Sequence, residues 1–103
     1  MILNKTPYGA PDTDTVAGIT FVKRGNTVSF YGSLDSLSSN TSIVLGTVKE
    51  GLRPLNSYAC YPFYIKTMPF MPTGTLWVGS NGTITLYKGS ETSGYVSGTY
   101  VVP

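Results

Sequence analysis

Short runs of alternating apolar and polar residues recur along this chain, and residues that favour turns separate them. This alternation is typical of half-buried β-strands, because successive side chains of a strand point to opposite faces. No stretch places its apolar residues at helical spacing. Seven strand candidates are bounded by Gly, Pro, Asn and Ser, and they cover residues 16–23, 27–34, 42–48, 57–66, 74–79, 83–88 and 94–102. The sequence therefore predicts an all-β fold, an antiparallel sandwich or barrel.

The chain has 103 residues, the size of one compact domain. Residues 1–14 hold Pro, Gly and Asp at close intervals, so we interpret them as a linker or neck segment and expect the β domain to cover 15–103. A domain of this size buries a limited core, and contacts with further subunits would add stability. No apolar run reaches the length of a membrane span, so membrane insertion is not expected.

Composition removes several classes of chemistry. Charged residues make up 12% of the chain and the net charge is +2. The seven basic residues are scattered along the chain, so nucleic acid is not an expected partner. His, the commonest general base and metal ligand, is absent. The single cysteine, Cys60, lies in an apolar strand and is expected to be a packed thiol. We expect no cofactor, no metal site and no pairing of a nucleophile with a base.

The acidic residues give no sign of a catalytic pair, which in glycosidases consists of two carboxylates on either side of one sugar bond. All five fall in predicted loops rather than among apolar neighbours: Asp12, Asp14, Asp35, Glu50 and Glu91. We expect solvated turn residues, no catalytic residues, and a protein that is not an enzyme.

The first hairpin can be given a register, because its apolar side chains must share one face. A turn at residues 24–25 pairs Phe21 with Val28 and Ile19 with Phe30, which collects four large apolar groups on one side. The sequence therefore predicts a hairpin with an even loop at this point.

The second hairpin, TGTLWVGSNGTITLYK, contains Asn-Gly, which favours a two-residue turn. That turn would set apolar residues opposite polar ones. A three-residue loop at 80–82 instead opposes Val78 with Ile84 and Leu76 with Leu86. We therefore predict the longer loop, with its glycine in a left-handed conformation.

The same register places four residues on the other face of this hairpin: Thr75, Trp77, Thr85 and Tyr87. The only tryptophan then points away from the aliphatic side. A tryptophan in that position needs cover from another sheet, a neighbouring subunit or a ligand. Structural cover and ligand contact are both open at this point.

The segment SYACYPFYIKTMPFMP carries aromatic residues on both faces and three prolines. A central strand tolerates proline poorly, so this strand is expected at an edge or bent at Pro62. Burial on both sides could come from a loop at 67–73 of the same chain, or from packing between protomers of one or more of Tyr61, Phe63, Phe70 and Met71.

Four pieces then follow one another in a familiar order: GITFVKRGNTVSFYGSL, LGTVKEGLRP before the aromatic strand, LWVGSNGTITLY, and a closing GYVSGTYVVP. Together they resemble head domains of phage tail receptor-binding proteins, most of all those of lactococcal and related Gram-positive siphophages. The resemblance covers about residues 17–103.

The resemblance implies a β head of jelly-roll type, assembled as a homotrimer at the tip of a virion baseplate or tail fibre. Such a head joins other baseplate or tail proteins through an upstream segment and binds a saccharide of the host cell wall. Aromatic side chains suit that ligand, because their faces stack on the C–H faces of sugar rings. Carried over by position, the saccharide-binding residues are Thr75, Trp77, Tyr87 and Tyr95.

Two alternatives are carried beside this interpretation. One is a purely structural virion module, in which Trp77 lies in an interface between subunits. The other is a monomeric carbohydrate-binding module of a cell-wall hydrolase.

Overall fold

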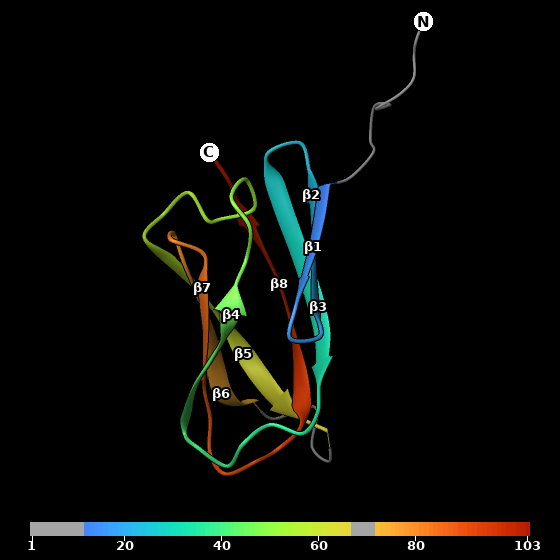
Figure 1. Cartoon of the computed structure of the whole chain (residues 1–103), viewed down its shortest axis with the longest axis vertical. Helices are drawn as coiled ribbons and strands as arrows, with labels where there is room; N and C mark the ends of the chain where they lie inside the picture. The colour runs from blue at the N-terminus through green and yellow to red at the C-terminus, as the bar shows by residue number, and fades with distance from the viewer. Residues whose placement is uncertain (1–11, 67–71) are drawn as a thin grey trace, which may run out of the picture.

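The computed structural model describes residues 12–66 and 72–103, and all regular secondary structure in these residues is β-strand. The eight strands are β1 (Asp12–Val16), β2 (Ile19–Arg24), β3 (Thr27–Leu34), β4 (Ser42–Thr47), β5 (Tyr58–Ile65), β6 (Pro72–Gly79), β7 (Thr83–Tyr87) and β8 (Gly94–Val101). They form one antiparallel sheet in the order β1-β2-β3-β8-β5-β6-β7-β4, which curls into a nearly closed barrel (Figure 1). The predicted all-β class is confirmed, with eight strands instead of seven.

The additional strand is β1, which includes three residues, 12–14, that the sequence analysis assigned to the linker segment. Its side chains on the barrel's inner side are Asp12, Asp14 and Val16, since Asp14 pairs with the buried Phe21 and Val16 with the buried Ile19. Only one of the three is apolar. Hydrophobic alternation therefore gave no signal for this strand, and the expectation that these two aspartates lie in loops was wrong.

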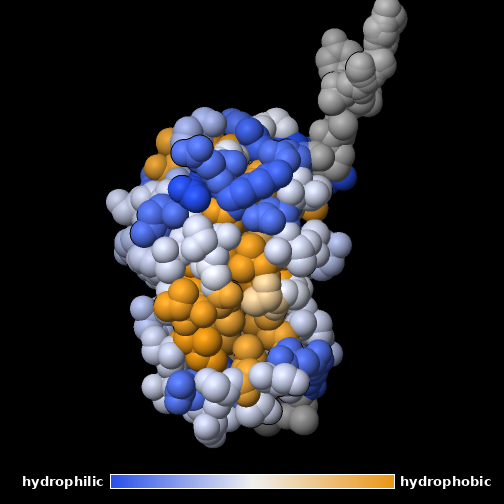
Figure 2. Space-filling view, viewed as in Figure 1, coloured by the Kyte–Doolittle hydropathy of each residue, from blue (hydrophilic) through white to orange (hydrophobic). Residues whose placement is uncertain are grey.

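The barrel closes between β1 and β4 through side chains. Lys49, just after β4, donates its backbone N–H to Asp14 Oδ2 at 2.9 Å and its Nζ to Asp12 Oδ1 at 2.7 Å. Farther along, a Cβ added to Gly46 would lie 2.7 Å from Val16 Cγ1, so the absence of a side chain lets the two strands approach. Figure 2, which faces this seam, shows apolar residues gathered below the middle of the molecule and hydrophilic ones above.

The β2–β3 hairpin has the predicted buried face but a different register. Its turn lies at residues 25–26, so Phe21 pairs with Phe30 and Ile19 with Gly32. Gly25 has a φ of 64°, which suits the first central position of a type II′ turn. The predicted turn at residues 24–25 was wrong, but the difference of two residues keeps every side chain on its predicted face.

The β6–β7 hairpin has the predicted register. Val78 pairs with Ile84 and Leu76 with Leu86, across a three-residue loop at 80–82. Gly82 has a φ of 90°, and its N–H donates to the carbonyl oxygen of Gly79 at 2.9 Å. The conformation predicted for this glycine is confirmed.

The strand β5 is internal, between β8 and β6, so of the two alternatives expected for it, an edge position or a bend at Pro62, the edge position was wrong. Pro62 is tolerated because β5 pairs with β8 only through residues 63–65, and the β5–β6 register shifts just beyond, between Phe63 and Tyr64. Phe63 is fully buried within the chain. Of the residues suggested for packing between protomers, Phe70 and Met71 lie outside the described residues.

One core fills the barrel and joins its two halves. Phe30 of β3 meets Tyr61 of β5 edge to face, with ring centroids 4.8 Å apart. The ring of Tyr61 lies against Gly98 of β8, where an added Cβ would come within 2.3 Å of it. Tyr61 also donates its hydroxyl hydrogen to the carbonyl oxygen of Thr99 at 2.9 Å. Tyr61 therefore packs inside this chain.

Candidate functional site

The outer side of β4, β5, β6 and β7 carries an unusual set of side chains. Strand pairing places Val44 beside Thr85, Thr85 beside Trp77, and Trp77 beside Cys60, in one row across the four strands. A neighbouring row includes Tyr87 beside Thr75. We call this surface the aromatic face and define it as Val44, Tyr58, Cys60, Thr75, Trp77, Thr85 and Tyr87.

Trp77 is half-buried, and part of its cover comes from one tyrosine. The rings of Tyr58 and Trp77 stack with centroids 5.6 Å apart and planes 22° from parallel. Tyr58 pairs with Gly79 across the strands, and a Cβ added there would lie 3.0 Å from Trp77 Cζ3. The missing side chain of Gly79 thus makes room for the indole. The stacked pair forms an aromatic platform on the outside of the barrel.

Polar groups adjoin this platform. Thr85 is nearly buried between Trp77 and Val44, while Thr75 is partly exposed and Tyr87 has an exposed ring and hydroxyl. Hydroxyl groups both donate and accept hydrogen bonds, as sugar hydroxyls do. The arrangement can therefore stack on an apolar ring face and also bond to polar groups at its rim.

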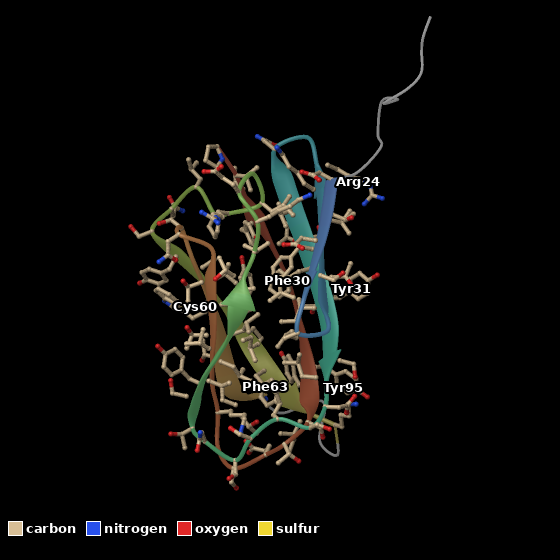
Figure 3. The ribbon with its side chains drawn as sticks, in the orientation of Figure 1. Arg24, Phe30, Tyr31, Cys60, Phe63 and Tyr95 are labelled. Atoms are coloured by element: carbon tan, nitrogen blue, oxygen red, sulfur yellow. The ribbon has the colours of Figure 1, made fainter. Side chains whose placement is uncertain are left out.

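The fourth predicted site residue, Tyr95, lies elsewhere. It is on the outer side of β8, opposite Tyr64 of β5 and Ser33 of β3. Lys66 Nζ sits 5.5 Å from the centre of its ring and also pairs with Asp35 Oδ1 at 2.5 Å. In the view of Figure 3, Cys60, the strand partner of Trp77, lies at the left and Tyr95 at the lower right, on the neighbouring strands β5 and β8. The structure thus brings Thr75, Trp77 and Tyr87 together without Tyr95.

Cys60 is exposed on the aromatic face, so the expectation of a packed thiol was wrong. The inner positions of β5 are taken by Ala59, Tyr61 and Phe63, and alternation turns the cysteine outward. Assigning Phe63 to the core would have predicted this, because alternation along β5 then turns Cys60 outward.

The outer side of β1, β2, β3 and β8 is chemically different. One row runs from Thr15 through Thr20 and Tyr31 to Ser97, by strand pairing. In the next row Ser29 Oγ and Thr99 Oγ1 share a hydrogen bond of 3.3 Å. We call this surface the hydroxyl face and define it as Thr13, Thr15, Thr20, Val22, Ser29, Tyr31, Ser97 and Thr99.

The described carboxylates do not gather into a catalytic or metal-binding group. Within residues 12–66 and 72–103, no three residues of the His, Cys, Asp and Glu types are placed to share a metal ion. Asp12 bonds to Lys49 and Asp35 to Lys66. The hydrogen bond from Lys49 holds the pKa of Asp12 below its usual value. Asp12 joins β1 to the end of β4, and Asp35 joins the end of β3 to the end of β5.

Among the Lys and Arg residues that the structure describes, Lys88 differs from the others because it is buried. Its Nζ donates to the carbonyl oxygens of Ser38 at 2.8 Å, Asn40 at 3.1 Å and Gly89 at 3.0 Å. The buried ammonium thereby fixes the connection between β3 and β4 against the end of β7. Its role is structural.

No family model matches the chain, and no match is found among curated proteins. In the part of the chain that the structure describes, no helix is long and apolar enough to cross a membrane.

Proposed function

We propose that this protein is a non-enzymatic receptor-binding head of a phage tail, and that its aromatic face binds a saccharide of the host cell wall. The observation that carries the proposal is the stacked Tyr58–Trp77 platform, half-exposed on the outer wall beside the hydroxyls of Thr75 and Tyr87. A pyranose ring places its C–H face on such a platform and its hydroxyls against the rim. Tyr95 has no part in this site.

The expected assembly is a homotrimer at the tip of a virion baseplate or tail fibre, attached to other tail proteins through an upstream segment. Several weak sites held on one particle would bind a wall polymer firmly through their high effective concentration. The sequence resemblance and the all-β barrel support this assembly.

An interface is the competing use of the aromatic face, as in a structural virion module. Val44 is 66% exposed and Tyr58 is 55% exposed, on a surface with few charges. Exposed apolar side chains on one surface, as these are, also pack between subunits. A monomeric carbohydrate-binding module would use the same platform without a partner.

The only tryptophan of the chain lies on the platform, so its fluorescence reports binding directly. Titration with wall polysaccharide purified from a phage-sensitive Gram-positive strain should change the Trp77 emission in a saturable way. Adsorption to the same cells should fall at least tenfold in Trp77→Ala, a loss of about 1.4 kcal/mol. Tyr31→Ala, an aromatic truncation on the hydroxyl face, is the matched control and should adsorb normally.

Unchanged adsorption of a folded Trp77→Ala variant would reject the saccharide site. The assembly is measured separately, as the molar mass by light scattering after size exclusion. Three times the mass of one 11.0 kDa chain supports the head. A trimer that Val44→Asp dissociates, combined with no binding of polysaccharide, would favour the structural module. A monomer that binds would favour the carbohydrate-binding module.

A further inference from the structure

A pocket of about 330 Å³ opens at the end of the barrel where the β2–β3 and β6–β7 turns meet the connection between β4 and β5. This is the hydrophilic upper part of the molecule in Figure 2. Its lining combines charged and hydroxyl side chains with apolar surface, and consists of Lys23, Glu50, Gly51, Arg53, Pro54, Ser80 and Pro103. The pocket is separate from the aromatic face.

The wall formed by the β4–β5 connection is held in place by the rest of the barrel. The backbone N–H of Val48 donates to the carbonyl oxygen of Gly82 at 2.9 Å, and that of Leu55 to Val101 at 2.8 Å. The buried hydroxyl of Tyr100 donates to the carbonyl oxygen of Leu52, whose side chain is itself fully buried. A segment tied at three places presents a pocket that exists before any ligand arrives.

Arg53 is oriented within this wall. Its Nε donates to the carbonyl oxygen of Val48 at 3.1 Å, which fixes the plane of the guanidinium group. An added Cβ on Gly82 would lie 2.5 Å from that Nε, so the glycine turn leaves the space that the arginine fills. Among the hydrogen bonds of the described residues, Arg53 uses only Nε. Its terminal N–H groups are available as a fork of donors, the geometry that binds a carboxylate or phosphate in two places.

The side chains on the other walls of the pocket indicate which kind of ligand would carry this carboxylate or phosphate. Lys23 adds a second cation from β2, whereas Glu50 and Ser80 supply an acceptor and a hydroxyl. The three charged side chains sum to one positive charge. A ligand with one anionic group and several hydroxyls satisfies both sets, and the volume suits a molecule the size of a sugar.

We infer that this pocket is a second binding site, for a saccharide that carries an acidic group. The carboxylate or phosphate of the ligand bonds to the Arg53 fork and lies near Lys23, while its hydroxyls bond to Glu50 and Ser80. This site does not depend on the proposed role of the aromatic face.

The test is an NMR titration of the intact chain with D-glucuronate, with glucose 6-phosphate, and with neutral glucose. The backbone amides of Gly51, Ser80 and Gly82 should shift with either or both of the anionic sugars, and glucose should bind at least tenfold more weakly. Binding should weaken as salt is added, because the contacts are ionic. A response to glucuronate alone identifies a carboxylate site, and a response to glucose 6-phosphate alone identifies a phosphate site.

Variants test the cations that line the pocket. Arg53→Lys keeps the charge but loses the fork, and should weaken binding at least fivefold. Lys23→Gln should weaken it severalfold and leaves the wall of the pocket intact. Lys66→Gln, at a cation outside the pocket, should bind as the native chain does. Equal binding of glucose, no shift with either anion, or unchanged affinity in both Arg53→Lys and Lys23→Gln would overturn the inference.

Discussion

The barrel wall has two halves, one formed by β1, β2, β3 and β8 and the other by β4, β5, β6 and β7. The halves are alike on the inside and differ on the outside. On the hydroxyl face, strand pairing places the exposed Tyr31 in a row with Thr15, Thr20 and Ser97, and the exposed Tyr95 lies two residues along β8 from Ser97. On the aromatic face, Tyr58 and Trp77 lie in contact, and other exposed large side chains lie close by. Inward residues are mostly apolar in both halves, with the aspartates of β1 as exceptions, whereas the outward ones are free to vary. Two aromatic rings stacked on each other at such free positions, as Tyr58 and Trp77 are, therefore point to binding.

The two halves share one core, so the largest loss of stability is expected when a ring is removed from that core. Phe30→Ala removes a ring that packs against Phe21 on its own half and Tyr61 on the other, and should cost about 3–5 kcal/mol. Both halves should unfold in one transition. The measurement is urea unfolding, followed by Trp77 fluorescence and by far-ultraviolet circular dichroism.

The matched control is the next residue of β3, which points outward. Tyr31→Ala should change the free energy of unfolding by no more than about 0.5 kcal/mol. Two separate transitions in the Phe30→Ala variant would show that the halves are independent units, contrary to the single core.

Lys88 offers a smaller effect at the link between the halves. Lys88→Met keeps the aliphatic length but removes the donor to Ser38, Asn40 and Gly89, so it should cost about 2–3 kcal/mol. Thermal unfolding of this variant is compared with Lys66→Met, whose more exposed ion pair with Asp35 should contribute less than about 1 kcal/mol. Equal losses in the two variants would contradict a structural role specific to the buried ammonium.

Two tyrosine hydroxyls join β8 to β5 and to the connection between β4 and β5. Their ionisation should lower the stability of the protein at alkaline pH. Tyr61 donates to Thr99, and Tyr100 donates to Leu52. Burial raises the pKa of both phenols above the usual value of 10.0. A raised folded pKa gives a contribution that is complete below the unfolded pKa and is lost as the pH rises above it.

Stability should therefore fall above about pH 10. Tyr100→Phe should cost roughly 1 kcal/mol at neutral pH and should flatten the alkaline decline. Urea midpoints measured from pH 7 to 11.5 test both effects. An alkaline decline as steep in Tyr100→Phe as in the native chain would mean that other groups cause it.

The sequence predicted those features that alternation alone determines. In the β6–β7 hairpin only one loop length aligns Val78 with Ile84, so the register followed. In the β2–β3 hairpin two registers keep the same face inside, and the conformation of Gly25 decides between them. Alternation could not reveal β1, whose inner side carries two aspartates that meet Lys49.

In the candidate site, too, the sequence predicted some placements and not others. Thr75, Trp77 and Tyr87 belong to one hairpin, and local register was enough to bring them together. The place of Tyr95 depends on β8 lying between β3 and β5, and the Tyr58–Trp77 contact depends on how β5 aligns with β6. Strands remote in sequence set the place of Tyr95, and the Tyr58–Trp77 contact depends on a strand pairing whose register shifts, so neither follows from the alternation within one strand.

The β1–β4 seam gives the smallest effect, because its ion pair is exposed to solvent. The hydrogen bond from Lys49 lowers the pKa of Asp12 below 3.8, so its contribution is present above that pH and is lost as the pH falls below it. The urea midpoint of Asp12→Asn should lie slightly under that of the native chain at pH 7, and the two should converge below about pH 3. A difference that persists at lower pH would mean that the asparagine disturbs β1 itself. Trp77 fluorescence of the folded variant should not change, because this contact closes the barrel without touching the aromatic face.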